Sequence, residues 1–290
     1  MPELFDLTGK HILLTGASRG LGRAVAQACW ARGAHLFLFA RARDALEALR
    51  AELLAAAQPG QAVHIADGDL ALPASVPALM RQVTQTWTRV DVLINNAAIV
   101  GAIGRAWEND WATWEMTLRV NLLAPVELCR ACVPLMLSAG EGSMINLSGG
   151  GATSPRPNFS AYATAKTALV RFSETLASEL RGTDIRVNCV APGAMNTAML
   201  QAVLDAGADR AGDEYARALA QAQHGGTLPA RAAELIAFLA STSSRGITGK
   251  LISAGWDRWE TLPVHLADLQ DSDIYTLRRI IPRERGKDWE

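Results

Sequence analysis

Apolar residues in this chain alternate between short strand-like runs and longer runs with helical spacing. The run His11 to Leu14 is followed by a glycine-rich turn and by good helix formers from Ala24 to Ala31, which predicts strand, turn and helix in that order. A second apolar run at 35–39 leads into 43–57, where leucines recur at helical spacing. Acidic residues near the start of this second helix favour the positive end of its dipole.

The same alternation continues along the chain. Further strands are predicted at 62–65, 90–94, 143–147, 185–190 and 250–253, and further helices at 75–87, 107–137 with an interruption near Pro125, 160–180, 197–206, 213–222 and 229–240. Strands and helices that repeat with short connections predict a parallel sheet with helices on both faces. About seven strands in this order fit one Rossmann-like, doubly wound α/β sheet better than two domains.

The pattern changes after Gly255, where a polar and aromatic tail with clustered arginines begins. A length of 290 residues alone gives a prior of about two domains. The order of strands instead predicts one domain over residues 1–255, which carries the site, and a C-terminal extension over 256–290. Aromatic and aliphatic residues are interleaved with the charges of this extension, so we expect it to pack on the domain or on a neighbouring subunit.

Composition excludes several classes of protein. A hydrophobic content of 49% with a net charge of −1 is the opposite of a disordered composition, and a near-neutral chain has no basic field that would attract nucleic acid. The four cysteines are too few for a disulfide framework, residues 1–6 lack the pattern of a signal peptide, and no apolar run approaches the roughly 20 residues that span a bilayer. We expect a soluble, cytoplasmic protein that binds neither nucleic acid nor membrane.

The glycine-rich turn after the first strand predicts a phosphate site. Its glycines remove Cβ atoms where the backbone turns sharply, so that a diphosphate can approach the free N–H groups of the following helix. The candidate cofactor contacts in this turn are Gly16, Ser18, Arg19, Gly20, Leu21 and Gly22. The plainer alternative is a turn glycine followed by two helix-packing glycines, which the strand-turn-helix context disfavours.

The same turn also matches the Gly-x-Ser-x-Gly elbow of α/β-hydrolases, at Gly16, Ser18 and Gly20. An elbow serine needs several strands built before it, an oxyanion loop, and Asp and His partners that follow in chain order. Here the serine would follow the first strand. We interpret the match as a coincidence.

The end of the second predicted strand distinguishes between a site for NAD and a site for NADP. An acidic residue there would accept hydrogen bonds from the ribose hydroxyls of NAD, whereas the 2′-phosphate of NADP prefers arginine. The strand ends at Arg41 without a carboxylate, and Arg19 lies in the glycine turn. Two guanidinium groups can hold a phosphate by charge-assisted hydrogen bonds, so NADP is favoured over NAD. The alternative is that Arg41 and Arg43 only solvate the start of a helix.

Tyr162 and Lys166 are four residues apart and therefore lie on one face of a helix. A phenol with its ordinary pKa near 10 is a poor acid-base catalyst at neutral pH, but a neighbouring ammonium stabilises the phenolate and lowers that pKa. Tyr162 could then exchange a proton with a substrate oxygen. Taken alone, the pair has a plainer interpretation, which is a half-buried tyrosine beside a lysine at the solvated edge of a helix.

Several motifs taken together make the chain resemble the short-chain dehydrogenase/reductase family from about Leu7 to Gly255. They occur in the order of that family: Thr15-Gly16-x-x-x-Gly20-x-Gly22, Asp69-Leu70, Asn95-Asn96-Ala97-Ala98, Val120-Asn121, Ser148, Tyr162-x-x-x-Lys166 and Pro192-Gly193-x-x-x-Thr197. The resemblance implies an enzyme that moves a hydride between NAD(P) and an alcohol or carbonyl carbon. It also implies a small-molecule substrate and assembly as a homodimer or homotetramer.

The resemblance assigns roles to these residues. Tyr162 would be the acid-base residue, Lys166 would hold ribose hydroxyls and lower the pKa of the phenol, Ser148 would orient the substrate oxygen, and Asn121 would support a water in a proton relay. Asp69 and Asn95 would border the adenine and its ribose, and Thr197 would contact the carboxamide. The remaining candidate cofactor contacts are Leu70, Ala97, Pro192 and Gly193. An NAD-dependent alcohol or sugar dehydrogenase and a non-catalytic dinucleotide sensor on the same scaffold are the alternatives.

Two positions depart from the pattern of the family. Ala98 stands where the family usually has glycine, which tightens the room beside the cofactor. The family commonly has its serine thirteen residues before the tyrosine, where this chain has Gly149, whereas Ser148 stands fourteen residues before (162 − 148 = 14). Either the glycine loop lets Ser148 reach the site, or another group replaces the hydroxyl, with Thr153 and Ser154 as the weaker candidates.

The remaining chemical patterns have plainer interpretations. Cys129 and Cys132 match a redox or half-zinc spacing, but without a second pair of ligands we expect buried side chains of a packing helix. The five histidines are scattered along the sequence, and no metal is predicted. Trp107, Trp111 and Trp114 recur on one helical face, where packing against the core or another subunit is favoured over ligand stacking.

Overall fold

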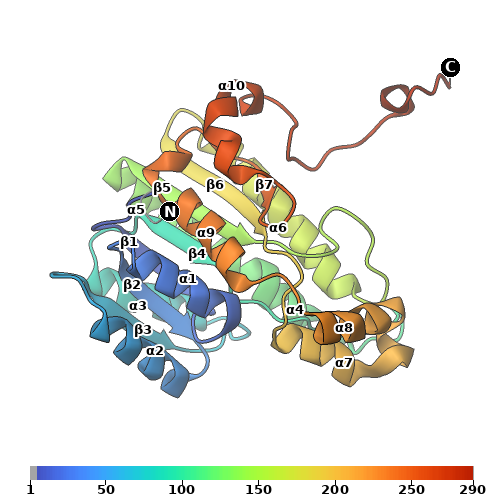
Figure 1. Cartoon of the computed structure of the whole chain (residues 1–290), viewed down its shortest axis with the longest axis horizontal. Helices are drawn as coiled ribbons and strands as arrows, with labels where there is room; N and C mark the ends of the chain where they lie inside the picture. The colour runs from blue at the N-terminus through green and yellow to red at the C-terminus, as the bar shows by residue number, and fades with distance from the viewer. Residues whose placement is uncertain (1–4, 290) are drawn as a thin grey trace.

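A computed structural model describes residues 5–289 of the chain. Residues 1–4, part of the segment that lacks a signal-peptide pattern, lie outside the described residues. The strands form one sheet with the order β3-β2-β1-β4-β5-β6-β7 (Figure 1), and every pairing in it is parallel. This order confirms the predicted doubly wound α/β fold.

All the predicted strands are present, with ends that differ by a residue or two. They are β1 (His11–Thr15), β2 (His35–Ala40), β3 (Val63–Asp67), β4 (Val92–Asn95), β5 (Glu141–Leu147), β6 (Asp184–Ala191) and β7 (Leu251–Ser253). Because the strands are parallel, their carboxyl ends meet at one edge of the sheet, where the loops that follow them gather.

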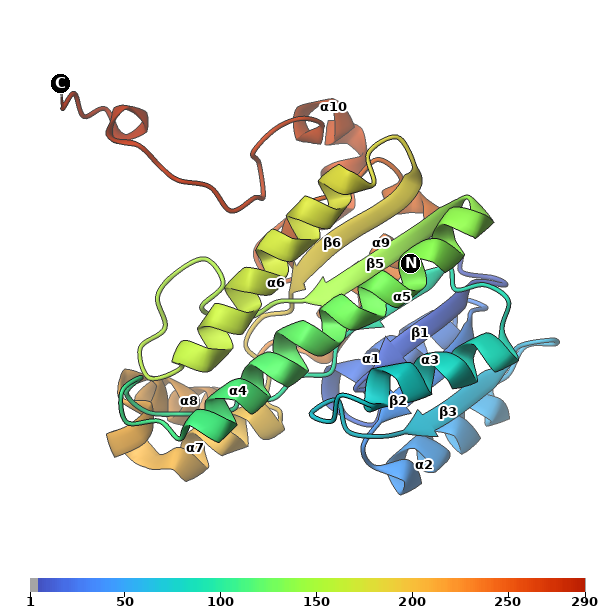
Figure 2. The ribbon, with the colours of Figure 1, turned by 180° about the vertical axis from the view of Figure 1, so that it is seen from behind.

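Helices cover both faces of the sheet. One face carries α1 (Gly20–Trp30), α2 (Arg43–Ala55) and α9 (Pro229–Ala240), which are in front in Figure 1. The other face carries α3 (Ser75–Thr86), α5 (Ala124–Ala139) and α6 (Ser160–Glu179), which are in front in Figure 2. The first helix begins at Gly20, earlier than predicted, because the glycine turn already contributes its first residues.

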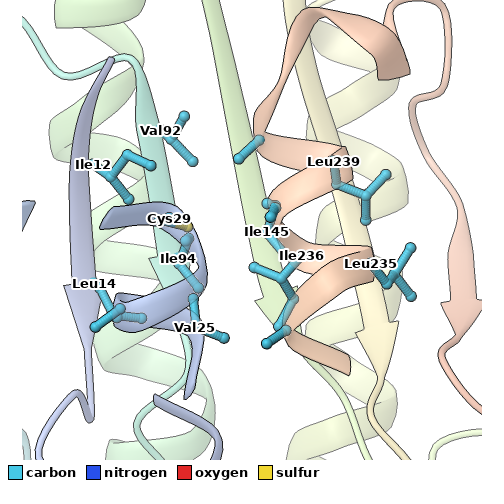
Figure 3. Packing of buried hydrophobic residues seen from close by; sticks show 14 of the residues in the cluster. Ile12, Leu14, Val25, Cys29, Val92, Ile94, Ile145, Leu235, Ile236 and Leu239 are labelled. Carbon is cyan, nitrogen blue, oxygen red and sulfur yellow. The ribbon is translucent and has the colours of Figure 1, made fainter. Parts of the chain in front are cut away.

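Alternating side chains of the central strands supply both halves of the core. Ile12 and Leu14 of β1 pack toward α1, whereas Leu13 between them packs on the opposite face, as the two-residue period of a strand requires. Figure 3 shows Ile12 and Leu14 with the neighbouring strand residues beside α1 and α9. Both faces of these strands are buried, which explains why the sequence shows continuous apolar runs there.

The long helix predicted over 107–137 is interrupted but not broken. Asp110 caps the start of α4 (Trp111–Leu118), with its side chain accepting from the N–H of Thr113 at 2.8 Å. The π-helical segment η1 (Arg119–Leu123) then joins α4 to α5. Pro125 has no N–H and its ring crowds the carbonyl of Asn121, four residues back, so the helix widens just before the proline.

This continuous helix, 111–139, is long and apolar enough to cross a membrane by length and composition. Its most apolar window has a mean hydropathy of 1.5, and 33% of that window is buried. The expectation that no apolar run reaches this length is therefore wrong. Part of the apolar surface is explained by the fold, because Leu128, Cys129 and Cys132 of α5 pack on the sheet.

The helices α7 (Ala198–Ala211) and α8 (Asp213–His224) lie together beside the start of α4 (Figures 1 and 2), away from the layers that cover the sheet. Residues of both helices pack in an apolar cluster with Ile103, Phe159 and Tyr162. Loops that follow three different strands therefore meet at this cluster.

The C-terminal extension packs on the domain through its first part. Trp259, Leu262 and Leu269 are buried in the core on the side of α9. The carbonyl of Tyr275 then accepts a hydrogen bond from the N–H of Leu251 in β7, at 2.8 Å. The N–H of Leu277 also donates to the carboxylate of Glu174 in α6, at 2.7 Å. Beyond Leu277 the chain leaves the body of the molecule (Figures 1 and 2). The boundary at residue 255 stays a prediction, because the extension shares the core of the preceding residues.

Three histidines that are scattered in the sequence gather on adjacent strands. The rings of His11 and His35 are 4.8 Å apart, and Trp87 packs edge-on against His11 and His64. Burial lowers the pKa of His35 and of His64, and the charge of His11 lowers both further. The parallel register of β1, β2 and β3 brings these side chains together, which linear spacing could not indicate.

We expect this cluster to make the fold less stable in mild acid. Because the folded state lowers the pKa of His35 and His64, the unfolded chain binds more protons once the pH falls below about 6.5. The urea midpoint should therefore fall between about pH 7 and pH 5, and a His35→Gln/His64→Gln variant should show a smaller fall. An equal fall in the variant would contradict this role of the two histidines.

Candidate active site

A cleft of about 1070 Å³ opens at the carboxyl ends of the strands. The glycine turn, the end of β2, the loop after β4 and the start of α7 all contribute to its wall, together with Tyr162 and Lys166 of α6. The topology thus brings the predicted phosphate site and the predicted acid-base pair into one cavity.

Close packing explains the glycines of the turn. Gly16 and Gly20 have positive φ angles of 68° and 54°, which disfavour residues with a Cβ atom. A Cβ atom on Gly22 would lie 2.1 Å from the carbonyl oxygen of Gly16. Asn96 fixes the backbone of the turn, since its side-chain amide donates to the carbonyls of Thr15 and Gly16 at 3.0 and 3.1 Å.

The first turn of α1 suits an anion. The helix has no side-chain cap at Arg19 and no acidic residue in its first turn. Its first N–H groups therefore lack a capping acceptor, and the positive end of the dipole faces the cleft without a carboxylate beside it. These residues fit the diphosphate of a dinucleotide.

Arg19 and Arg41 both line the cleft and are exposed. Within residues 5–289 neither guanidinium forms a hydrogen bond or an ion pair. Arg43 differs, because Asp67 accepts a hydrogen bond from it at 2.8 Å and Glu47 accepts another at 3.2 Å. The two cleft arginines are thus available to an anion, whereas Arg43 is occupied.

Tyr162 and Lys166 lie on the buried face of α6, so the interpretation of a lysine at a solvated helix edge is wrong. The ammonium of Lys166 donates to the carbonyl of Leu147 at 2.7 Å and lies 5.7 Å from the centre of the Tyr162 ring. In the described part of the chain, the hydroxyl of Tyr162 makes no hydrogen bond to another residue. It is therefore free to bind a substrate oxygen.

Burial governs the ionisation of both groups. It raises the pKa of Tyr162, and the positive charge of Arg156 opposes that rise. Burial also lowers the pKa of Lys166 to about 8. In this structure the nearby cation that favours the phenolate is therefore an arginine of the loop before α6, which the sequence pattern did not indicate.

Position 149, rather than 148, faces the phenol. A Cβ atom built on Gly149 would lie 2.5 Å from the hydroxyl oxygen of Tyr162. Ser148 contributes to the cleft wall, but its Oγ is buried and has no hydrogen-bond partner in the described structure. The side-chain position that faces the tyrosine thus carries no hydroxyl, and the role of Ser148 stays a prediction.

The structure places most of the other predicted residues at the cleft. Those that line it are Ser18, Leu21, Asp69, Leu70, Ala97, Pro192 and Thr197. Asn95 does not line it, because its side chain lies between the sheet and α5, where it donates to Asn146 at 2.8 Å and to the carbonyl of Pro125 at 3.3 Å. Gly193 also lies off the wall, and a Cβ atom there would press on Thr227 at 2.8 Å.

Asn121 is fully buried behind the cleft. Its side chain accepts from the N–H of Ile99 at 2.9 Å and donates to the carbonyl of Ile99 at 2.8 Å. This pair of bonds ties η1 to the loop after β4, which forms part of the cleft wall. The side chain of Asn121 therefore positions that loop, and its predicted part in a proton relay stays untested.

Sequence reasoning missed the apolar side of the cleft. Its wall there includes Ile99, Met116, Val120, Met195 and Met199. The charged wall residues other than Lys166 are Arg19, Arg41 and Asp69, which follow β1, β2 and β3. Ile99 and Met195 lie in loops, which have no period that marks a lining residue. Met116, Val120 and Met199 lie in helices, where spacing alone does not show which side chains face a cleft.

The cysteines are buried as expected, whereas Trp107 and Trp111 are exposed, so the expectation that they pack on the core is wrong and packing on another subunit stays a prediction. Cys129 and Cys132 are fully buried, and burial raises the pKa of the Cys129 thiol to about 12, which leaves no reactive thiolate. No group of three or more His, Cys, Asp or Glu residues in 5–289 is arranged to hold a metal. Trp107 precedes α4, so only Trp111 and Trp114 lie on one face of that helix. Their rings are stacked with their centres 5.2 Å apart.

Comparisons with known proteins agree with this geometry. A family model described as short chain dehydrogenase matches residues 10–207. Nodulation protein G of Rhizobium sp. (strain N33) is 33% identical over 258 residues, which cover 86% of this chain and 96% of that protein. The 3-oxoacyl-[acyl-carrier-protein] reductase FabG of Escherichia coli (strain K12) is 32% identical over 250 residues, which cover 85% and 96%.

Solved structures give the same result. An oxidoreductase from Escherichia coli superimposes with a TM-score of 0.75 at 27% identity, over 88% of this chain and 98% of that one. A short chain dehydrogenase from Shigella flexneri 2a, complexed with NADP, also gives a TM-score of 0.75 at 27% identity, over 87% and 100% of the two chains.

Proposed function

Because this chain belongs to the short-chain dehydrogenase/reductase family, we propose that it is an NADP(H)-dependent oxidoreductase with Tyr162 as its acid-base residue. Members of this family bind NAD(P) and act on CH–OH or C=O groups. The observation that carries the proposal is the single cleft that joins the uncapped start of α1, two unpaired arginines and the Tyr162–Lys166 pair.

The chain's own residues account for cofactor binding. The N–H groups at the start of α1 would hold the diphosphate, and Arg19 and Arg41 would hold a 2′-phosphate by charge-assisted bonds. Lys166 and Thr197 also line the cleft, and Thr197 lies beside Gly20 of the glycine turn. A nicotinamide dinucleotide bound there carries the hydride that is exchanged with the substrate carbon.

Tyr162 handles the proton of the reaction. In reduction its hydroxyl donates a hydrogen bond and then a proton to the carbonyl oxygen, and in oxidation the phenolate accepts the proton of the alcohol. The ring of Tyr162 is buried, and its hydroxyl reaches the cleft where the substrate would bind. Arg156 opposes the rise in the pKa of this phenol, and the ammonium of Lys166, 5.7 Å from the ring centre on the same helix face, adds to this effect while it is protonated.

The wall around Tyr162 favours an uncharged substrate. Lining residues from the loops after β4 and β6, and from α4, carry no charge, and methionines at 116, 195 and 199 give the wall adaptable apolar surface. A carboxylate or phosphate next to the reacting carbon would meet no compensating side chain on these loops. We therefore propose an apolar ketone or secondary alcohol as the substrate class.

Three finer proposals accompany this function. NADP is favoured over NAD because no carboxylate of the cleft wall comes from the end of β2, where Arg41 stands. A homodimer or homotetramer in the cytoplasm fits the family. A non-catalytic dinucleotide sensor is the alternative, and the presence of Tyr162 and Lys166 in the same cleft counts against it.

A carbonyl panel tests the proposal directly. We expect the purified protein to consume NADPH, followed by the near-ultraviolet absorbance of the reduced nicotinamide, with at least one apolar ketone. NADH should support a lower kcat/KM. Tight NADPH binding without turnover of any ketone, aldehyde or alcohol in the panel would instead favour the sensor.

A further inference from the structure

Arg156 is packed against the aromatic ring that carries the proposed acid-base hydroxyl. Its guanidinium carbon lies 5.3 Å from the centre of the Tyr162 ring and 4.1 Å from the centre of the Phe159 ring. Arg156 does not line the cleft. Its contact with Tyr162 therefore lies outside the wall of the cleft.

Glu214 of α8 fixes this guanidinium in place. Nε of Arg156 donates to one carboxylate oxygen at 3.1 Å, and a terminal nitrogen donates to the other at 2.8 Å. Both side chains are mostly buried, with 18% and 24% of their surface exposed. A two-point hydrogen bond of this kind sets the orientation of the guanidinium as well as its distance.

The surroundings of Tyr162 leave room for such a residue to matter. Gly149 presents no side chain to the phenol. The charged and titratable groups whose contacts bring them nearest to Tyr162 are Lys166 on its own helix, Arg156 with Glu214, and Arg210 and Tyr215 on α7 and α8. These two helices also carry Asp205, Asp209, Asp213, Arg217 and His224. Arg210 is engaged elsewhere, since its Nε donates to the carbonyl of Ile103 at 3.1 Å.

We propose that Arg156, held by Glu214, is a positioning residue that keeps a permanent positive charge against the ring of Tyr162. This inference rests on the proposed function. Lys166 cannot supply such a charge at every pH, because burial lowers its pKa to about 8. The guanidinium stays protonated throughout, and a cation within about 6 Å of an aromatic ring is attracted to its face. The phenolate strengthens that attraction, so Arg156 favours proton loss from Tyr162.

The pH profile of alcohol oxidation tests this role. With saturating NADP, kcat should rise with pH as the phenol ionises. Arg156→Met keeps most of the stacked surface and removes the charge, so the midpoint should move up by about one unit, a roughly tenfold loss at neutral pH that disappears at high pH. Arg156→Lys should restore part of the shift. Arg156→Gln, which can still bond Glu214, serves if methionine disturbs the loop.

Arg210→Met is the matched control, because Arg210 also ties α7 to a loop beside the cleft but does not stack on Tyr162. Its midpoint should equal that of the parent enzyme. An unchanged midpoint in both Arg156→Met and Arg156→Gln would overturn the proposal. An equal shift in Arg210→Met, or a loss of the same size at every pH, would overturn it as well.

A second readout separates this inference from the proposed function. The chain has three tyrosines, so in a Tyr215→Phe/Tyr275→Phe background the ultraviolet difference spectrum reports the ionisation of Tyr162 alone. Arg156→Met should raise that midpoint in the absence of any substrate. If the parent protein turns over no alcohol or ketone, the proposed function fails, and this titration still decides the role of Arg156. Equal midpoints with and without Arg156→Met would reject this role of Arg156.

Discussion

A Tyr162→Phe variant should lose about 10²–10⁴-fold in kcat, because it lacks the hydroxyl that exchanges a proton with the substrate oxygen. The ring itself should stay in place, since it packs in the apolar cluster formed with α7 and α8 and Arg156 stacks on its face. NADPH affinity, measured by fluorescence titration, should change by less than about threefold, because a loss of one phenol hydroxyl removes no phosphate contact.

Tyr215→Phe provides the matched control for this experiment. Tyr215 packs against the same apolar cluster from α8, so its variant removes a hydroxyl near the cleft without removing the proposed acid-base group. It should retain parental kcat. A Tyr162→Phe enzyme with full activity would eliminate the mechanism proposed here, and an equal loss in both variants would assign the effect to the packing of the cluster.

Arg41→Ala should weaken NADPH binding by about 10–100-fold and leave NADH binding nearly unchanged. A hydrogen bond to a charged group contributes roughly 1.5–3 kcal/mol, and every 1.4 kcal/mol corresponds to about a tenfold change in affinity. Arg41 lines the cleft and has no ion-pair partner among residues 5–289, so its guanidinium can turn to a 2′-phosphate. Calorimetric titration with each dinucleotide measures both affinities.

Arg43→Ala controls for the general loss of positive charge at this end of the cleft. Arg43 lies two residues from Arg41 but is bound to Asp67 and Glu47, so its removal should change the preference for NADPH over NADH by less than about threefold. If Arg41→Ala leaves the preference for NADPH over NADH unchanged, the proposal that Arg41 recognises NADP is wrong. A large effect of Arg43→Ala would point to the overall field rather than to one contact.

The fold was predictable because its signals are local. Each strand is an apolar run of a few residues, each helix has apolar spacing near 3.6, and the glycine turn lies between the first pair. The errors fall where tertiary structure changes a local signal. Asp110 starts α4 later than its tryptophans suggested, and the π-helical turn before Pro125 keeps the long helix continuous.

The candidate site was predictable only where a motif fixes its own geometry. Tyr162 and Lys166 share a helix face by spacing alone, and the glycine turn needs its small residues whatever surrounds it. Asn95 illustrates the limit, because its motif placed it at the cofactor, whereas its side chain points to Asn146 in the sheet. The direction of the side chain at the last residue of β4 is set by the sheet and not by the motif.

By itself the sequence determined a doubly wound α/β sheet, a phosphate-binding turn, an acid-base pair and membership of the family, because each depends on short-range spacing. Only the tertiary structure decided that Gly149 faces the phenol of Tyr162 and that Glu214 holds Arg156 against the ring of that tyrosine. The same holds for the three histidines that come together on adjacent strands. The bond between Arg156 and Glu214 and the contacts of the histidines join segments that are far apart in the chain. Their geometry follows from strand register and helix packing, which a linear pattern does not encode.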